Sequence, residues 1–167
     1  MAVAAIVLAA GAGTRFGGPK QRILLPHVLA RLRPTSVAEI VVVTGAYELE
    51  AEDARVVVCE DWERGPGASL RRGLAAMRPG TEAAVVVLAD GPRLAPEAVE
   101  RVIGAWRAGA GELVAASYAG ERGHPLVVAR SLWAAIPDEG LRALEPALVP
   151  CDDLGAPGDV DTVEELR

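Results

Sequence analysis

Short runs of consecutive apolar residues alternate along the chain with segments whose apolar residues are spaced as on one face of a helix. The runs are rich in Val and Ile and are bounded by Gly, Pro or Asp, which is typical of strands covered on both faces. The predicted strands are residues 3–9, 39–44, 55–59, 83–89, 112–118 and 126–129. The predicted helices are residues 27–33, 68–78, 96–108, 131–136 and 138–144, with a last helix in the tail 158–167.

This alternation predicts an α/β fold with three layers, α/β/α, in which a mostly parallel, Rossmann-like sheet carries helices on both faces. Ligands of such sheets bind outside the carboxyl ends of the strands. Polar or glycine-rich segments follow those ends at residues 10–20, 90–93 and 120–125. No repeat or linker divides the 167 residues, so we expect a single domain over residues 1–167.

Charge and cysteine content narrow the function classes. A net charge of −6 argues against a nucleic-acid surface. The apolar runs are shorter than the roughly 20 residues of a membrane span, and no charged side chain precedes the first run as in a secretory signal, so we expect a cytoplasmic protein without a membrane partner. Cys59 and Cys151 lie far apart without CxxC spacing, and we expect them to be small buried residues.

The most informative segment is LAAGAGTRFGGPK, residues 8–20, directly after the first predicted strand. Glycines allow the backbone to approach a ligand closely and to direct amide protons at phosphate oxygens. Arg15 and Lys20 add positive charge, and Lys20 is the single lysine among 17 basic residues. An ammonium group can follow a phosphate as a compact point charge. The segment therefore predicts a phosphate-binding loop, the alternative being a plain turn between strand and helix.

Two common nucleotide motifs do not fit this loop. A Walker loop needs GK[ST], whereas Gly18 is followed by Pro19 and Lys20 by Gln21. A dinucleotide fingerprint needs GxGxxG and an acid about 20 residues later, whereas Phe16 stands at the third glycine position. Two cations also suit a triphosphate better than a dinucleotide pyrophosphate.

The loop resembles the signature LAxGxSxRMGxxK of the MobA-like nucleotidyltransferases, and the branch it is most similar to is the molybdenum cofactor (molybdopterin) cytidylyltransferases. The resemblance implies that the backbone and side chains of this loop bind a nucleoside triphosphate, with Arg15 and Lys20 acting as catalytic residues on the phosphates. The implied nucleotide-binding residues are Leu8, Ala9, Ala10, Gly11, Gly13, Thr14, Arg15 and Lys20.

Two later segments also resemble the family. Asp90-Gly91-Pro92 is similar to the end of its LADMP motif, which implies that Asp90 is catalytic and binds Mg²⁺; an Asp-Gly turn is the alternative. Residues 61–70 resemble the segment ending in GxxxSL, which implies that Gly65 and Ser69 contact the base. From the residues alone, a helix cap at Ser69 is the default.

The resemblance extends through the second half of the chain. Gly123-His124-Pro125 matches the family's GHP, so His124 is implied to bind the acceptor; a turn residue satisfied by backbone is the alternative. Residues 159–166 resemble the DIDTPEDL ending, which implies Asp161 as the second metal ligand with Asp159 as its alternate. A capping box of Asp161 and Glu164 explains the same residues.

The activity implied by the resemblance is transfer of a nucleoside monophosphate from a triphosphate to a phosphorylated small molecule such as molybdopterin, with release of pyrophosphate. The family's cytidylyl branch tends to carry LAAG where the guanylyl branch carries LAGG, so CTP is the implied nucleotide. A molybdoenzyme or its maturation factor is the implied protein partner.

Two other functions compete with this one. Because the region after Trp133 is shorter than in the family, a nucleotide-binding regulatory module without turnover is an alternative. A short-chain nicotinamide oxidoreductase ranks last, since neither Tyr47 nor Tyr118 has a lysine four residues later.

Overall fold

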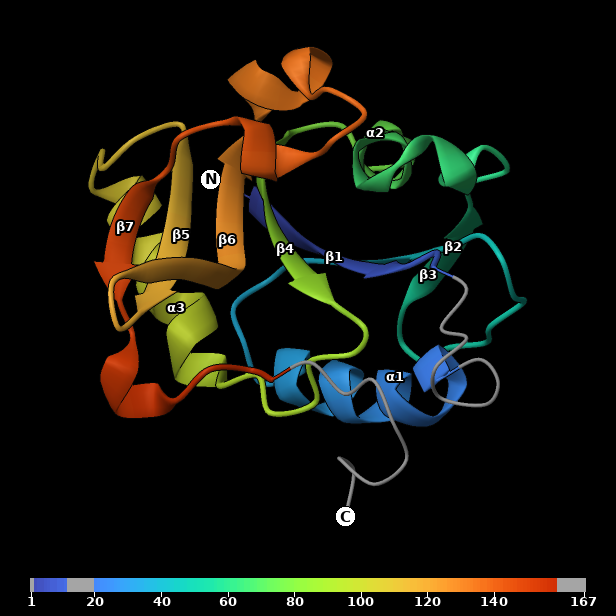
Figure 1. Ribbon diagram of the computed structural model, residues 1–167, viewed down its shortest axis with the longest axis horizontal. Helices are drawn as coiled ribbons and strands as arrows, with labels where there is room; N and C mark the ends of the chain where they lie inside the picture. Colours follow the sequence, from blue (N-terminus) through green and yellow to red (C-terminus); the bar gives the residue numbers. More distant parts are fainter. Residues whose placement is uncertain (1, 12–19, 159–167) are drawn as a thin grey trace.

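The computed structural model describes residues 2–11 and 20–158. Three α-helices and seven strands of this part of the chain form three layers, with α1 and α3 on one face of a sheet and α2 on the other (Figure 1). The strands are β1 (Ala2–Ala9), β2 (Ile40–Thr44), β3 (Arg55–Val58), β4 (Thr81–Leu88), β5 (Leu113–Tyr118), β6 (Glu121–Ala129) and β7 (Ala147–Pro150). The helices are α1 (Lys20–Leu32), α2 (Pro66–Ala75) and α3 (Pro96–Arg107), with 3-10 turns η2 (Trp62–Arg64), η3 (Arg130–Ala135), η4 (Leu141–Ala143) and η5 (Asp152–Leu154).

The strands follow the order β3-β2-β1-β4-β6-β5-β7. β1 pairs in parallel with β2 and β4, β2 with β3, and β5 with β7, while β6 runs antiparallel to both of its neighbours. The prediction of a mostly parallel α/β sheet is therefore confirmed. The reversed β6 places its first residues at the edge where the parallel strands end.

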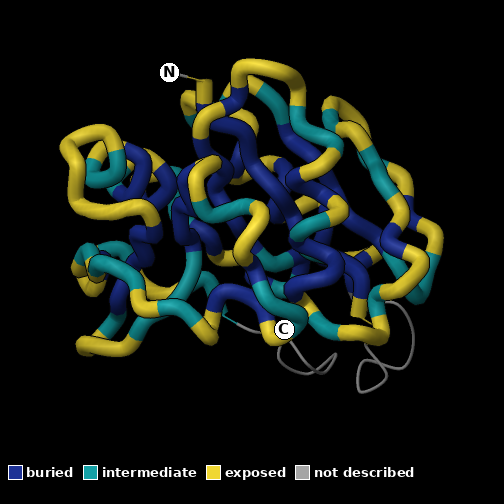
Figure 2. Tube along the Cα trace, turned by 90° about the horizontal axis from the view of Figure 1, so that it is seen from above, coloured by how far each residue is buried: buried dark blue, intermediate teal, exposed yellow. Residues whose placement is uncertain are grey.

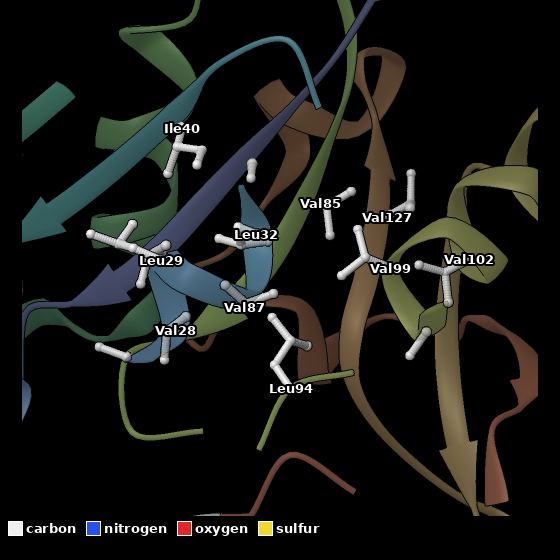
Figure 3. Packing of buried hydrophobic residues seen from close by; sticks show 14 of the residues in the cluster. Val28, Leu29, Leu32, Ile40, Val85, Val87, Leu94, Val99, Val102 and Val127 are labelled. Atoms are coloured by element: carbon white, nitrogen blue, oxygen red, sulfur yellow. The ribbon is translucent and has the colours of Figure 1, made fainter. Parts of the chain in front are cut away.

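The sheet is buried on both faces because its strands are apolar on consecutive residues. Along β1, Val3, Val7 and Ala9 belong to the core under α1 and α3, whereas Ile6 belongs to the core under α2. Figure 3 shows the first of these cores, and Figure 2 shows the buried strands enclosed by exposed loops. Both predicted buried cysteines are confirmed, since Cys59 is 1% and Cys151 0% exposed.

Helix α1 begins earlier than predicted, at Lys20 rather than residue 27, and contains Pro26. An internal proline costs about 3 kcal/mol because it removes a backbone hydrogen bond and crowds the preceding turn. Leu25 and Val28, on either side of the proline, are almost completely or completely buried, and each such side chain contributes about 1.5–3 kcal/mol. Burial on both sides of the proline therefore outweighs its cost.

The second half of the chain differs most from the predicted elements. β6 begins at Glu121 rather than at residue 126, and the predicted helix over 138–144 is only the 3-10 turn η4. Strand β7 was not predicted, because its four residues are too few to display a period. The predicted tail helix lies outside the described residues. Within 2–11 and 20–158, none of the helices has the length and apolar character needed to cross a bilayer.

Candidate active site

The predicted nucleotide loop and Asp90 leave the sheet from neighbouring strands. β1 and β4 pair in register at Leu8 and Leu88, and the amide of Ala89 donates to the carbonyl of Leu8 at 3.0 Å. Ala10 is buried, and its carbonyl accepts from the amide of Ala46 at 3.1 Å. Gly11 and Asp90 therefore begin their loops side by side at one edge of the sheet.

After Gly11 the described chain resumes at Lys20, the first residue of α1. Gly13, Thr14 and Arg15 lie outside the described residues, and so does the side chain of Lys20. The roles predicted for these four residues remain predictions.

Gln21 joins the two ends of this loop, and sequence reasoning missed it. Its Nε2 donates to the carbonyl of Gly11 at 2.8 Å, and the residue is only 5% exposed. Its Oε1 is buried and accepts no hydrogen bond from the described part of the chain. A buried amide that bonds on one side only is costly unless a further donor reaches it. Gln21 thus links the two ends of the loop and places a hydrogen-bond-accepting oxygen, Oε1, beside them.

Asp90 lies half-buried in the turn after β4, where the amide of Gly91 donates to the carbonyl of Leu88 at 3.2 Å. The chain before residue 159 packs against this turn, because the amide of Arg93 donates to the carbonyl of Pro157 at 3.1 Å. A Cβ on Gly91 would lie 3.1 Å from the Cβ of Pro157, so a side chain there would push Pro157 back by a few tenths of an ångström. Residues 156–158, which precede the predicted ligands Asp159 and Asp161 in the sequence, therefore lie beside the Asp90 turn.

Asp159 and Asp161 themselves lie outside the described residues. Within 2–11 and 20–158, no three His, Cys, Asp or Glu side chains gather closely enough to hold a metal. The donor chemistry at Asp90 still fits a hard divalent cation, which prefers carboxylate oxygen and retains several waters. Of the predicted metal ligands, Asp90 lies among the described residues, and its role as a ligand remains a prediction.

His124 lies in β6 near Asp90, not in the turn that the alternative reading expected. The hydroxyl of Tyr118 donates to the carbonyl of His124 at 2.7 Å and fixes the backbone there. Burial lowers the pKa of His124 to about 4, with Asp90 raising and Arg122 lowering it to a smaller extent. The imidazole is therefore neutral at pH 7 and can both donate and accept a hydrogen bond.

Two cavities meet at His124. One, of about 340 Å³, extends toward Gly91, Tyr118 and residues 156–158. The other, of about 370 Å³, extends over the α2 face to Leu8, Leu70 and residues 139–142. Their shared lining is Leu88, Arg122, Gly123 and His124. Each has the size of a small-molecule pocket, so the edge of the sheet offers room for two ligands around one junction.

The residues predicted to contact the base, Gly65 and Ser69, lie at the start of α2. Gly65 precedes the helix with φ 133°, and Ser69 is 3% exposed within it. Ser69 is not the helix cap, because that position belongs to Gly65, which has no side chain to accept from the first turn. The thiol of Cys59 lies 3.2 Å from Asp61 Oδ1 and near Ser69. Burial, chiefly, raises the pKa of this thiol.

Comparison with solved structures finds the same fold in several proteins. Rv0371c from Mycobacterium tuberculosis H37Rv is 27% identical, with a TM-score of 0.80 over 100% of this chain and 97% of that one; it has also been solved in complex with manganese. Its homologue from Mycobacterium sp. strain JC1 is 26% identical, with a TM-score of 0.80 over 98% of this chain and 92% of that one.

A nucleotidyl transferase from Methanothermobacter, Mth528, shares the fold at 20% identity and a TM-score of 0.77, over 99% of this chain and 94% of that one. Comparison with curated proteins gives no match. A family model described as the MobA-like NTP transferase domain matches residues 5–145. With that match spanning most of the fold and the edge where β1 and β4 end, the chain belongs to the MobA-like NTP transferase domain family.

Proposed function

We propose that this nucleotidyltransferase transfers CMP from CTP to a phosphorylated small molecule, molybdopterin, and releases pyrophosphate. The observation that carries the proposal is the junction at the sheet edge. There the starts of the nucleotide loop and of the Asp90 turn lie on neighbouring strands, and His124 separates two small-molecule cavities beside them. Two substrates that react with each other need such adjoining sites.

The reaction requires position and charge rather than a covalent intermediate. An oxygen of the acceptor phosphate forms a bond to the α-phosphorus of CTP while the bond to the pyrophosphate oxygen breaks in line. Arg15 and Lys20 offset the negative charge that gathers on the departing pyrophosphate. The amides of residues 11–14 orient the phosphates, and Gln21 keeps the loop closed at its base.

A divalent metal, Mg²⁺ in our proposal, would be held by Asp90 and Asp161, with Asp159 as the alternate to Asp161. When bound, it supplies charge neutralisation and orientation of the phosphates. Support comes from the carboxylate at the end of β4 and from the 156–158 segment, which leads to both other aspartates. Among the relatives, Rv0371c has been solved with manganese.

The two substrates take different places around the junction. We assign the base of CTP to the neighbourhood of Ala10, Gly65 and Ser69, where the methyl of Ala10 narrows the space in favour of a pyrimidine. The acceptor takes the cavity on the α2 face, where the imidazole of His124 hydrogen-bonds it at the junction. We also keep as proposals a cytoplasmic location, a single domain over residues 1–167 and a molybdoenzyme or its maturation factor as partner.

Thermal unfolding with each of the four nucleoside triphosphates, with and without Mg²⁺, tests the nucleotide assignment. A ligand at 100 times its Kd stabilises the fold by about 2.7 kcal/mol, so the preferred nucleotide gives a shift of several degrees. We expect CTP with Mg²⁺ to give the largest shift. Equal shifts with all four, or none, would remove the assignment.

Pyrophosphate release with CTP and molybdopterin tests the activity. We expect Lys20→Ala and Asp90→Ala to lower turnover by about 100-fold or more. Matched controls are Arg31→Ala, at the other end of α1, and Glu82→Ala, at the other end of β4, both exposed and expected to retain full turnover. Nucleotide binding without pyrophosphate release would favour the regulatory module instead.

A further inference from the structure

Residues 137–144 form the far wall of the cavity on the α2 face, and we infer that Asp138 is a positioning residue that fixes this wall for the acceptor. The inference rests on the proposed function, which assigns the acceptor to that cavity. The floor of the cavity is apolar and comes from the sheet, through Leu8, Leu88 and Leu126. Its far side is formed by residues 139–142, which belong to no strand or α-helix of the described fold.

Asp138 ties the wall to α2 through both its side chain and its backbone. Oδ1 accepts from Arg71 Nη2 at 2.5 Å, and Oδ2 accepts from Arg64 Nη2 at 3.4 Å. Its carbonyl accepts from the amide of Gly67 at 2.9 Å, and Arg71 Nη1 also donates to the carbonyl of Ile136 at 2.7 Å. The hydrogen bond from Arg71 lowers the pKa of the Asp138 carboxyl, which is therefore ionised at neutral pH.

The start of α2 is shaped to receive this segment. A Cβ on Gly67 would lie 1.7 Å from the carbonyl oxygen of Pro137, and one on Gly65 would lie 2.4 Å from that of Asp138. Heavy atoms cannot approach so closely, so any side chain at either position would push the wall away. The two glycines therefore serve the docking of residues 137–138, whatever else Gly65 contacts.

The other end of the wall is held by Arg122, whose side chain crosses from β6. Nη1 donates to the carbonyl of Leu144 at 2.6 Å and Nη2 to that of Leu141 at 3.1 Å. Glu139 and Arg142 lie between these two held ends of the wall and line the cavity with charged side chains. Because Arg122 also borders His124, it belongs to the junction itself, whereas Asp138 lies outside the cavity and acts only through the wall.

Kinetics of pyrophosphate release test this role. We expect Asp138→Ala to raise the KM for molybdopterin about tenfold while kcat and the KM for CTP stay within about twofold, since a charged hydrogen bond that orders the wall is lost. Asp138→Asn keeps an oxygen for Arg71 and should restore most of the affinity. Asp153→Ala is the matched control, because its ion pair with Arg101 at 2.8 Å joins α3 to η5 away from the cavity.

Hydrogen exchange of the Gly67 amide reports the docking without any substrate. We expect the exchange of this amide to be at least about tenfold faster in Asp138→Ala than in the wild type. In the control Asp153→Ala its rate should stay unchanged. Gly67→Ala displaces the wall by a second route and should reproduce the rise in the KM for molybdopterin.

Each outcome has one meaning. An unchanged KM for molybdopterin in Asp138→Ala, or equal rises for molybdopterin and CTP, would overturn the positioning role while leaving the proposed function intact. If the wild-type protein releases no pyrophosphate with molybdopterin, the proposed function fails. The Gly67 exchange rates then decide about Asp138 alone, and equal rates in wild type and Asp138→Ala would overturn its role.

Discussion

Gly73 in α2 and Gly104 in α3 form a matched pair that tests the packing of the helices on the sheet. Each lies within the last four residues of its helix. A Cβ at Gly73 would lie 2.7 Å from Val43 Cγ2 and 3.3 Å from Ile6 Cδ1, whereas a Cβ at Gly104 would meet no atom within 4 Å. Substitution of either residue by alanine therefore adds the same methyl group to two different surroundings.

The expected magnitudes have opposite signs. Alanine improves helix propensity over glycine by about 0.5–1 kcal/mol at both positions. At Gly104 that is the whole effect, so Gly104→Ala should stabilise the protein. At Gly73 the methyl must displace Val43 and Ile6, which are both completely buried, and overpacking of this kind costs about 1–3 kcal/mol. Because the helix term is common to both variants, the difference between them equals the overpacking cost.

Thermal and urea unfolding followed by circular dichroism measure this difference. For a protein of this size, 1 kcal/mol corresponds to a shift in Tm of about 2–4 °C. Gly73→Ala should therefore melt at least about 2 °C below Gly104→Ala. If Gly73→Ala melts at or above the temperature of Gly104→Ala, the close contact of α2 with β1 and β2 is wrong.

Three further predictions concern the site and its surroundings. Gln21→Ala removes the bond to Gly11, worth about 1 kcal/mol, and should raise the Kd for CTP about fivefold by calorimetry. Burial raises the pKa of Tyr118 from 10.0 to about 12, so the unfolded chain ionises first and the Tm of the wild type should fall between pH 10 and 12; Tyr118→Phe should show a smaller fall, and an identical one would contradict the buried hydroxyl. Cys59 and Cys151 are buried with raised pKa values, so neither should react with a thiol reagent at pH 7 until the protein is unfolded.

The nucleotide half of the fold was predictable because its signals are local. Strand β1 is a run of apolar residues covered on both faces, and α3 begins at Pro96 as its first-turn proline indicated. The turn at Asp90 likewise follows a buried strand whose end the sequence marks. Each of these elements is decided by residues next to one another in the chain.

The second half of the fold was less predictable because its structure depends on distant partners. The wall at residues 137–144 is held by Arg71, through Asp138, and by Arg122. Both arginines lie far from it in sequence, so no local pattern of apolar residues could predict it. Gln21 was missed for a similar reason: its importance comes from Gly11, across a loop of the chain. Gln21 stands between Lys20 and Arg22, so its neighbours in the sequence give no sign that its side chain is buried.

The reversed direction of β6 allows a very short connection between β5 and β6. β5 and β6 are joined through Ala119 and Gly120, both with positive φ, in a two-residue turn at the rim of the smaller cavity. A parallel neighbour would have required a long crossover helix at this place. Residues added to the short turn would instead project over the smaller cavity without moving any helix. Lengthening this hairpin would therefore reshape the smaller cavity while the ends of β1 and β4 keep their places.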